Sequence, residues 1–293
     1  MVAGMTMGSG LATLGGYPFA VRYSRGASAR ARTFATLVAN AYDYLRDLFP
    51  DVTLDIAVIV ADRRDWRSRQ PYGLAYFDDA DDQIAPGIVV VPAGRGDFWA
   101  AMVEDLRESS TAEHPMLVAT YPDGAGGVDL QPFFDLVSVH ELGHALEVQA
   151  GVRLPTLWLS EIFANLILHA YVYARQPESA ATLEVLATVG ARTSRRDHGI
   201  RSPRYRTLED LETHYTGGER PMDPLNYVWY QYRWQRLAAA MFDADGEDGL
   251  IRFANFFRAG PDVRSGPHSA ISLAPLLSAE VSEVLAHAVR EWR

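Results

Sequence analysis

The residues best placed to do chemistry are two histidines and a glutamate in the stretch HELGH, residues 140–144. On a helix, His140 and His144 share one face, because four residues complete little more than one turn. Their imidazoles can therefore bind one metal ion, with zinc–nitrogen bonds of about 2.0–2.1 Å. Glu141 lies about 100° further round the helix, where it can reach a water held by that ion. The spacing predicts a zinc site with Glu141 as general base.

A third ligand is expected on the segment that follows, LPTLWLSEIFANL, which carries Glu161. An isolated glutamate on a helix is usually a solvated charge. Glu161, however, has apolar neighbours on both sides, where an unpaired carboxylate is costly and a bound cation removes the cost. Asn165, one turn later, is a candidate to hydrogen-bond a ligand imidazole and fix its tautomer; an ordinary surface or core amide is the alternative.

The element that carries HELGH is expected to be a helix over roughly residues 132–150. Pro132 suits the first helical position, Asp135 falls in the first turn, and Gly151 comes just after the end. Before it, apolar periodicity predicts a strand, helix, strand, strand and helix, at 19–26, 29–49, 52–60, 87–92 and 98–108. After it, helical patterns follow one another. The prediction is an α+β fold with a mixed α/β lobe (17–150) carrying a small sheet, and a mainly helical lobe (151–293) carrying Glu161.

Composition excludes several classes of function. The 293 residues contain no cysteine and no lysine, which removes thiolate zinc sites, Schiff-base chemistry and the phosphate-binding P-loop. Arginine as the only basic side chain besides histidine is typical of GC-rich bacterial coding. The formal charge of −10 argues against a nucleic-acid partner. With no apolar run of about 18 residues and no secretory signal pattern, we expect no membrane span and a cytoplasmic location, or a secreted one if a signal was removed.

HELGH followed by WLSEIFAN resembles the gluzincin zinc metallopeptidases, the superfamily of thermolysin and of the leukotriene A4 hydrolase-type aminopeptidases, and best resembles its peptidase MA-like members. The resemblance implies a thermolysin-like catalytic domain with Zn²⁺ in a cleft, held by His140, His144 and Glu161. It also implies a peptide or protein substrate and Glu141 as the general base. In the aminopeptidase branch a tyrosine that opens a later helix hydrogen-bonds the reaction intermediate. In LNYVWYQYRWQRLAAAMF, Tyr227 matches that tyrosine and Leu237 matches a leucine ten residues on.

The chain departs from the aminopeptidases in two places. It has no G-x-M-E-N string for the substrate's free amine. The aminopeptidases carry a glycine three residues after their catalytic tyrosine, and this chain has the bulky Tyr230 at that position. Aminopeptidase activity is therefore not implied. Tyr227 also belongs to a helical stripe of apolar and aromatic side chains, which is usually core packing. If Tyr227 is core, His214 or Tyr215 is the alternative donor to the oxyanion.

Three further points stay open in the sequence. GIVVVP (87–92) is either the edge strand that pairs with an extended peptide or a fully buried strand. The long connections 109–131 and 192–206, the second with six arginines, either border a cleft or are solvated loops. The function is expected to be zinc-dependent peptide hydrolysis. The alternatives are a zinc hydrolase acting on a non-peptide amide, ester or epoxide, and a zinc-containing binding module without turnover.

Overall fold

The computed structural model describes residues 10–66, 72–78, 87–109, 112–191, 203–215, 222–260 and 270–292. Its contacts divide the chain into two compact units, one of residues 1–101 and 130–149, the other of residues 102–129 and 150–293. The division expected at residue 150 stays a prediction. Within the arginine-rich connection, residues 192–202 lie outside the described part.

The first unit contains a five-stranded mixed sheet in the order β1-β2-β3-β5-β4. The strands are β1 (Ala12–Leu14), β2 (Ala20–Tyr23), β3 (Ile56–Ala61), β4 (Tyr76–Asp78) and β5 (Gly87–Pro92). β2, β3 and β5 run parallel, whereas β1 and β4 pair antiparallel at the two ends. The central strands β3 and β5 are runs of β-branched residues, as expected for strands with both faces covered.

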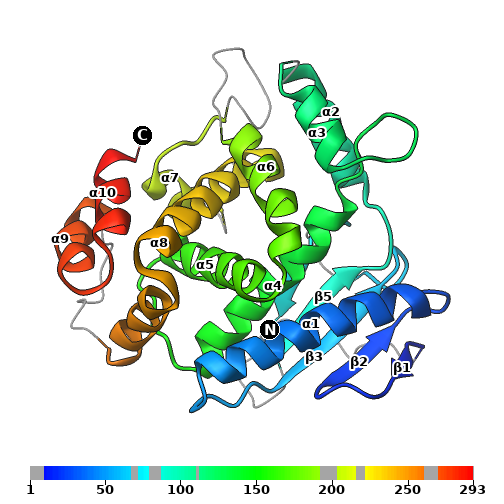
Figure 1. Cartoon of the computed structure of the whole chain (residues 1–293), viewed down its shortest axis with the longest axis horizontal. Helices are drawn as coiled ribbons and strands as arrows, with labels where there is room; N and C mark the ends of the chain where they lie inside the picture. Colours follow the sequence, from blue (N-terminus) through cyan, green and yellow to red (C-terminus); the bar gives the residue numbers. More distant parts are fainter. Residues whose placement is uncertain are drawn as a thin grey trace. The chain divides into compact units, whose positions relative to one another are not determined.

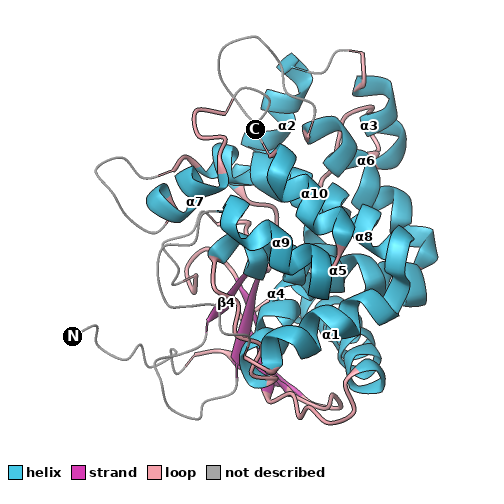
Figure 2. Cartoon of the chain, turned by 90° about the vertical axis from the view of Figure 1, so that its left-hand side faces the viewer, coloured by secondary structure: helices cyan, strands magenta, loops and turns pink. Residues whose placement is uncertain are grey.

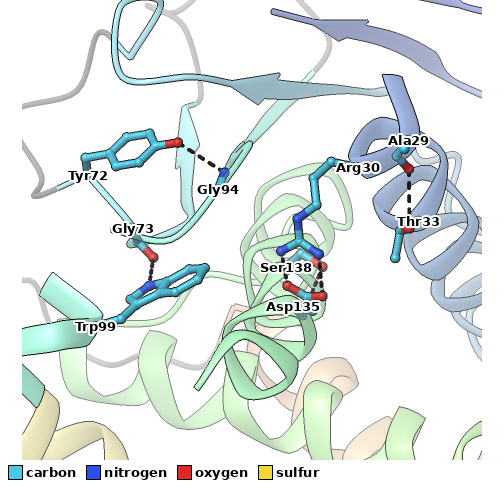
Figure 3. A network of polar contacts seen from close by, with 9 residues as sticks. All are labelled: Ala29, Arg30, Thr33, Tyr72, Gly73, Gly94, Trp99, Asp135 and Ser138. Carbon is cyan, nitrogen blue, oxygen red and sulfur yellow. Dashed lines mark hydrogen bonds and ion pairs between the residues drawn. The ribbon is translucent and has the colours of Figure 1, made fainter. Parts of the chain in front are cut away.

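Two helices cover one face of this sheet. α1 (Ser28–Leu48) packs on β2 and β3, α4 (Gln131–Gln149) packs on β4 and β5, and the helices contact each other. Figure 1 shows α1 lying along the sheet beside β3. Arg30 on α1 donates from both terminal nitrogens to the Asp135 carboxylate on α4, as Figure 3 shows. The pair is partly buried, so it fixes α1 against the first turn of the helix that carries HELGH.

The other face of the sheet is built on Ile59, Ala61 and Val90. Trp66 packs against this cluster and meets Tyr72 and Tyr76 edge to face, with ring centroids 5.2 and 5.3 Å apart. Hydrogen bonds fix the adjoining backbone: the Tyr72 hydroxyl accepts from Gly94 N, and the Trp99 indole donates to Gly73 O (Figure 3). Aromatic side chains therefore cover the face of the sheet that points away from α1 and α4.

The sheet order corrects one of the two interpretations of GIVVVP. β5 is an inner strand, because it pairs with β3 on one side and with β4 on the other. The edge beside it is β4, whose Tyr76, Phe77 and Asp78 lie opposite Val90, Val89 and Ile88. Such a short strand has almost no sequence signal of its own, so the pairing that makes it an edge could not be read from periodicity.

The second unit is helical in its described residues, apart from one isolated bridge between Pro122 and Val128. Figure 2 shows its helices in cyan, with α9 and α10 side by side. Its helices are α3 (His114–Thr120), α5 (Leu157–Arg175), the short 3-10 helix η1 (Pro177–Ser179), α6 (Ala180–Gly190), α7 (Leu208–His214), α8 (Pro224–Arg258), α9 (Ala270–Glu280) and α10 (Glu283–Glu291). α2 (Asp97–Ser109) crosses the boundary between the units at residue 101. The connection 109–131 is therefore not a continuous irregular loop, since it holds α3.

The core of the second unit is the contact of α5 with α8. α8 is kinked at Gly246, which has a positive φ of 59° that glycine adopts without strain. α5 is long and apolar enough to pass a length-and-composition test for a membrane span, and 78% of that window is buried inside the structure. Core helices pass the same test. The absence of a membrane span stays a prediction.

The α+β class predicted from the sequence is confirmed: a small mixed sheet combined with a majority of helices. Each element predicted before residue 132 has a counterpart in β2, α1, β3, β5 and α2. β1 and β4 were not predicted, since three-residue strands leave too little alternation to recognise.

Candidate metal centre

α4 places the HELGH residues close to where the sequence predicts them. The helix runs from Gln131 to Gln149, with Pro132 in its first turn, and Gly151 follows with a φ of 68°. A glycine in this left-handed conformation ends a helix without the strain that a side chain would cause. His140 and Glu141 are only 5% and 8% exposed, while His144 is partly buried. The three side chains are therefore largely removed from bulk water.

The two imidazoles meet edge to face on α4. Their planes are 82° apart and their Nε2 atoms are separated by 3.2 Å. Two nitrogens bound tetrahedrally to one zinc, at about 2.0–2.1 Å each, lie about 3.3 Å apart. The same distance also suits a hydrogen bond between two neutral rings. The separation of the two nitrogens is thus compatible with a shared ion or with a hydrogen bond between the rings.

Glu147 provides a partner for the second imidazole. Its Oε2 lies 3.5 Å from Nδ1 of His144, one turn along α4, and both side chains are mostly buried. A carboxylate on this side favours a proton on Nδ1 and leaves Nε2 with its lone pair. Glu147 was not among the site residues expected from the sequence. Its position three residues after His144, on the same helical face, was the available signal.

Glu161 lies in the second turn of α5 and is 3% exposed. Glu212 of α7 supports this helix end, because its Oε1 accepts from Trp158 N at 3.2 Å, and burial raises the pKa of Glu212. In the part of the chain that the structure describes, His140, His144 and Glu161 form a group whose ligand atoms all lie within 4.8 Å of one another.

This donor set fits a divalent metal ion. Two imidazole nitrogens and one carboxylate oxygen are the ligands of catalytic zinc sites of the His-His-Glu type. Glu161 is buried, and a buried carboxylate carries a large desolvation cost that a cation offsets. Neutral imidazoles leave the positive charge of such an ion only partly compensated, which suits Lewis-acid chemistry.

Gln231 on α8 joins Glu161 to Tyr227. Its Nε2 lies 2.7 Å from Oε2 of Glu161 and 2.6 Å from the hydroxyl of Tyr227. Gln231 was not among the site residues expected from the sequence, although it follows Tyr227 by four residues and therefore shares its face of the helix. Its contact with Glu161 depends on the packing of α8 against α5, which no local pattern predicts.

Asn165 belongs to the same cluster. Its Nδ2 donates to the backbone oxygen of Glu161 and to Oε1 of Gln231, both at 2.8 Å. The amide therefore lies next to the backbone of the third ligand, because residues four apart on α5 face the same side of that helix. The hydrogen bond from Asn165 to a ligand imidazole stays a prediction.

Tyr227 lies in the first turn of α8. Asp223 caps this helix by accepting from Leu225 N, and Asn226 makes two hydrogen bonds with the backbone of Tyr205. In the expected stripe of core side chains, Tyr227 is the partly exposed member. The later members are buried, namely Tyr230, Trp234, Leu237 and Met241. Tyr227 therefore combines a fixed backbone with a hydroxyl that is held by Gln231.

The two alternative donors occupy different surroundings. Tyr215 packs its ring on that of Tyr227, with centroids 4.6 Å apart. His214 stacks on Tyr205 at 4.1 Å, and its Nδ1 is buried with no hydrogen-bond partner among the described residues. Of the three candidates, Tyr227 is the one linked to Glu161 through a single side chain.

Comparisons of this chain with protein-family models, with curated proteins and with solved structures returned no match. The gluzincin resemblance rests on the motifs around HELGH, Glu161 and Tyr227.

Proposed function

We propose that the chain is a zinc-dependent metallohydrolase of the gluzincin type that cleaves peptide bonds. The observation that carries the proposal is the proximity of the His140, His144 and Glu161 ligand atoms, within 4.8 Å of one another. HELGH supplies Glu141 beside two of these ligands, which is the arrangement of zinc hydrolases that activate water. When bound, the metal polarises a substrate carbonyl and makes water more acidic.

Each remaining role falls to a named residue. Glu141 accepts a proton from the attacking water and passes it to the leaving nitrogen, as a general base and then a general acid. Tyr227 donates its hydroxyl hydrogen to the oxygen on which negative charge develops. Glu147 holds Nδ1 of His144 and so keeps that imidazole in the tautomer that presents Nε2.

A peptide is the favoured substrate because of the edge strand β4. β4 is antiparallel to β5 and contacts α4, the helix that carries HELGH. It ends the sheet in the described residues, which is the position at which an extended chain adds to a sheet. This order, with a mixed sheet, an antiparallel edge strand and a HELGH helix followed by further helices, also supports a thermolysin-like fold.

Peptide hydrolysis is tested with a diverse peptide library. Wild-type protein loaded with zinc is expected to release fragments with new termini that mass spectrometry identifies. Glu141→Gln and chelator-treated wild type are the controls, and both should leave the library intact. Cleavage of ester or non-peptide amide probes by the wild type, with the peptides left intact, would replace the peptidase by the alternative zinc hydrolase. Zinc binding without turnover of any probe would favour the binding module.

A further inference from the structure

Three side chains meet at the amide of Gln231, all from α5 and α8. The amide nitrogen contacts Oε2 of Glu161 at 2.7 Å and the Tyr227 hydroxyl at 2.6 Å. The amide oxygen accepts from Nδ2 of Asn165 at 2.8 Å. Asn165 and Glu161 are 4% and 3% exposed, so the cluster is mostly shielded from water. Every polar atom of the Gln231 side chain is therefore in a hydrogen bond.

The direction of each hydrogen bond in this cluster follows from one fixed group. The backbone oxygen of Glu161 only accepts, so the atom of Asn165 that faces it must be the NH₂ group. The second hydrogen of that NH₂ group points to Gln231, which must present its oxygen there. The Gln231 NH₂ group then faces Glu161 and Tyr227, and it donates one hydrogen to each.

We infer that Gln231 is a positioning residue that sets both the third metal ligand and the oxyanion donor; this inference rests on the proposed function. At Glu161 it donates to Oε2 and so fixes the orientation of the carboxylate. At Tyr227 it donates to the hydroxyl oxygen, so the hydroxyl hydrogen is not directed to Gln231. One neutral side chain thus prepares two parts of the site.

The chemical identity of residue 231 matters for this role. Two donor hydrogens on one nitrogen serve a carboxylate and a phenol together, which neither a hydroxyl nor a carboxylate at this position can do. An apolar side chain would leave the buried Glu161 carboxylate short of one donor. The loss of such an outer partner commonly weakens metal binding by about 10- to 100-fold.

The experiment compares Gln231→Met with Gln235→Met in the full-length chain. Gln235 is a matched control, since it is buried one turn further along α8 and contacts His169. Zinc affinity is measured by competition with a chromophoric chelator. Gln231→Met should bind zinc about 10- to 100-fold more weakly than wild type, and Gln235→Met should keep the wild-type affinity. Wild-type affinity in Gln231→Met would overturn the inference, as would an equal loss in both variants.

Asn165→Asp provides a second variant of nearly unchanged shape. An aspartate only accepts, so it would face two other acceptors, the backbone oxygen of Glu161 and Oε1 of Gln231. No orientation of the Gln231 amide then satisfies residue 165, Glu161 and Tyr227 together, so the orientation of Gln231 is no longer fixed. We expect weaker zinc binding and an altered visible spectrum of the cobalt-substituted protein. Wild-type zinc affinity and spectrum in Asn165→Asp would contradict the inferred orientation of Gln231.

The link to Tyr227 is tested by a double-mutant cycle in kcat/KM. If Gln231 acts on catalysis through Tyr227, Gln231→Met should slow Tyr227→Phe far less than it slows wild type. Full additivity would remove this half of the inference. The zinc and cobalt measurements need no turnover, so they decide the Glu161 half even if no peptide is cleaved and the proposed function fails. A wild-type chain that binds no zinc would overturn both.

Discussion

The Nε2 atoms of His140 and His144 face each other 3.2 Å apart on α4. A metal that binds between them binds the folded chain, because the unfolded chain does not hold two imidazoles at this spacing. Zinc at about 100 times its dissociation constant should therefore raise the free energy of unfolding by about 2.7 kcal/mol. Urea unfolding with and without zinc measures the effect. His140→Gln should lose it, and His287→Gln, a change at an exposed histidine, should keep it.

Glu141→Gln should slow hydrolysis strongly without releasing the metal. The amide keeps the size of the side chain but cannot accept the water's proton, and general-base catalysis contributes about 10²- to 10⁴-fold. Turnover and zinc content are measured on the same sample. Glu147→Gln is the matched control on α4, because it changes the partner of His144. This variant should bind zinc more weakly, whereas its rate of hydrolysis when fully loaded with zinc should change less. Normal turnover in Glu141→Gln would assign the general base to another residue.

Tyr227→Phe should lower kcat by about two orders of magnitude or more, equivalent to about 2.7–4 kcal/mol of lost transition-state stabilisation. Zinc content should stay at the wild-type value, since Tyr227 touches Gln231 and is not proposed as a ligand. Tyr215→Phe is the control, because it removes a hydroxyl from the ring stacked on Tyr227. A near-normal rate in Tyr227→Phe, with a slow Tyr215→Phe or His214→Gln, would move the oxyanion role to that residue.

The free energy of unfolding should decrease as the pH is lowered, because the imidazole of His169 is buried. Its ring is stacked on Tyr173 at 4.4 Å, and burial lowers its pKa to about 4, with Asp243 acting in the opposite direction. In the unfolded chain the imidazole has a pKa of about 6.5, so between these values the unfolded chain binds the extra proton. The contribution is complete above pH ~6.5 and is lost as the pH falls towards 4.

The corresponding loss in the free energy of unfolding is about 2 kcal/mol between pH 7 and pH 5. Urea unfolding at the two pH values measures it. His169→Gln should remove this part of the pH dependence, whereas His287→Gln should retain it. An identical pH dependence in wild type and His169→Gln would show that His169 is not the group responsible.

Local signals predicted the elements that carry the chemistry. The helix around HELGH was expected at 132–150 and lies at Gln131–Gln149. Pro132 favours the first turn of a helix, and Gly151 favours the position just after its end. Glu161 was identified from its apolar surroundings, and it is buried as expected. In such cases a few neighbouring residues determine the result, so sequence reasoning succeeds.

Features that depend on pairing between distant segments were missed. The sequence did not decide between an edge strand and a buried strand for GIVVVP, because β4, which pairs beside it, has only three residues. Gln231 was not expected at the site, since it reaches Glu161 across 70 positions of sequence. Periodicity gives the face on which a side chain lies, but it does not identify the helix opposite.

The most direct test of the proposed metal centre is the zinc content of purified chain that has been loaded with zinc and freed of excess metal. We expect one zinc per wild-type chain, bound to two nitrogens at about 2.0–2.1 Å and an oxygen at about 2.0–2.2 Å by X-ray absorption. Glu161→Gln should lower the zinc content, and His140→Gln combined with His144→Gln should abolish it. Wild-type protein without stoichiometric zinc, or a double histidine variant that still holds one, would contradict the proposal.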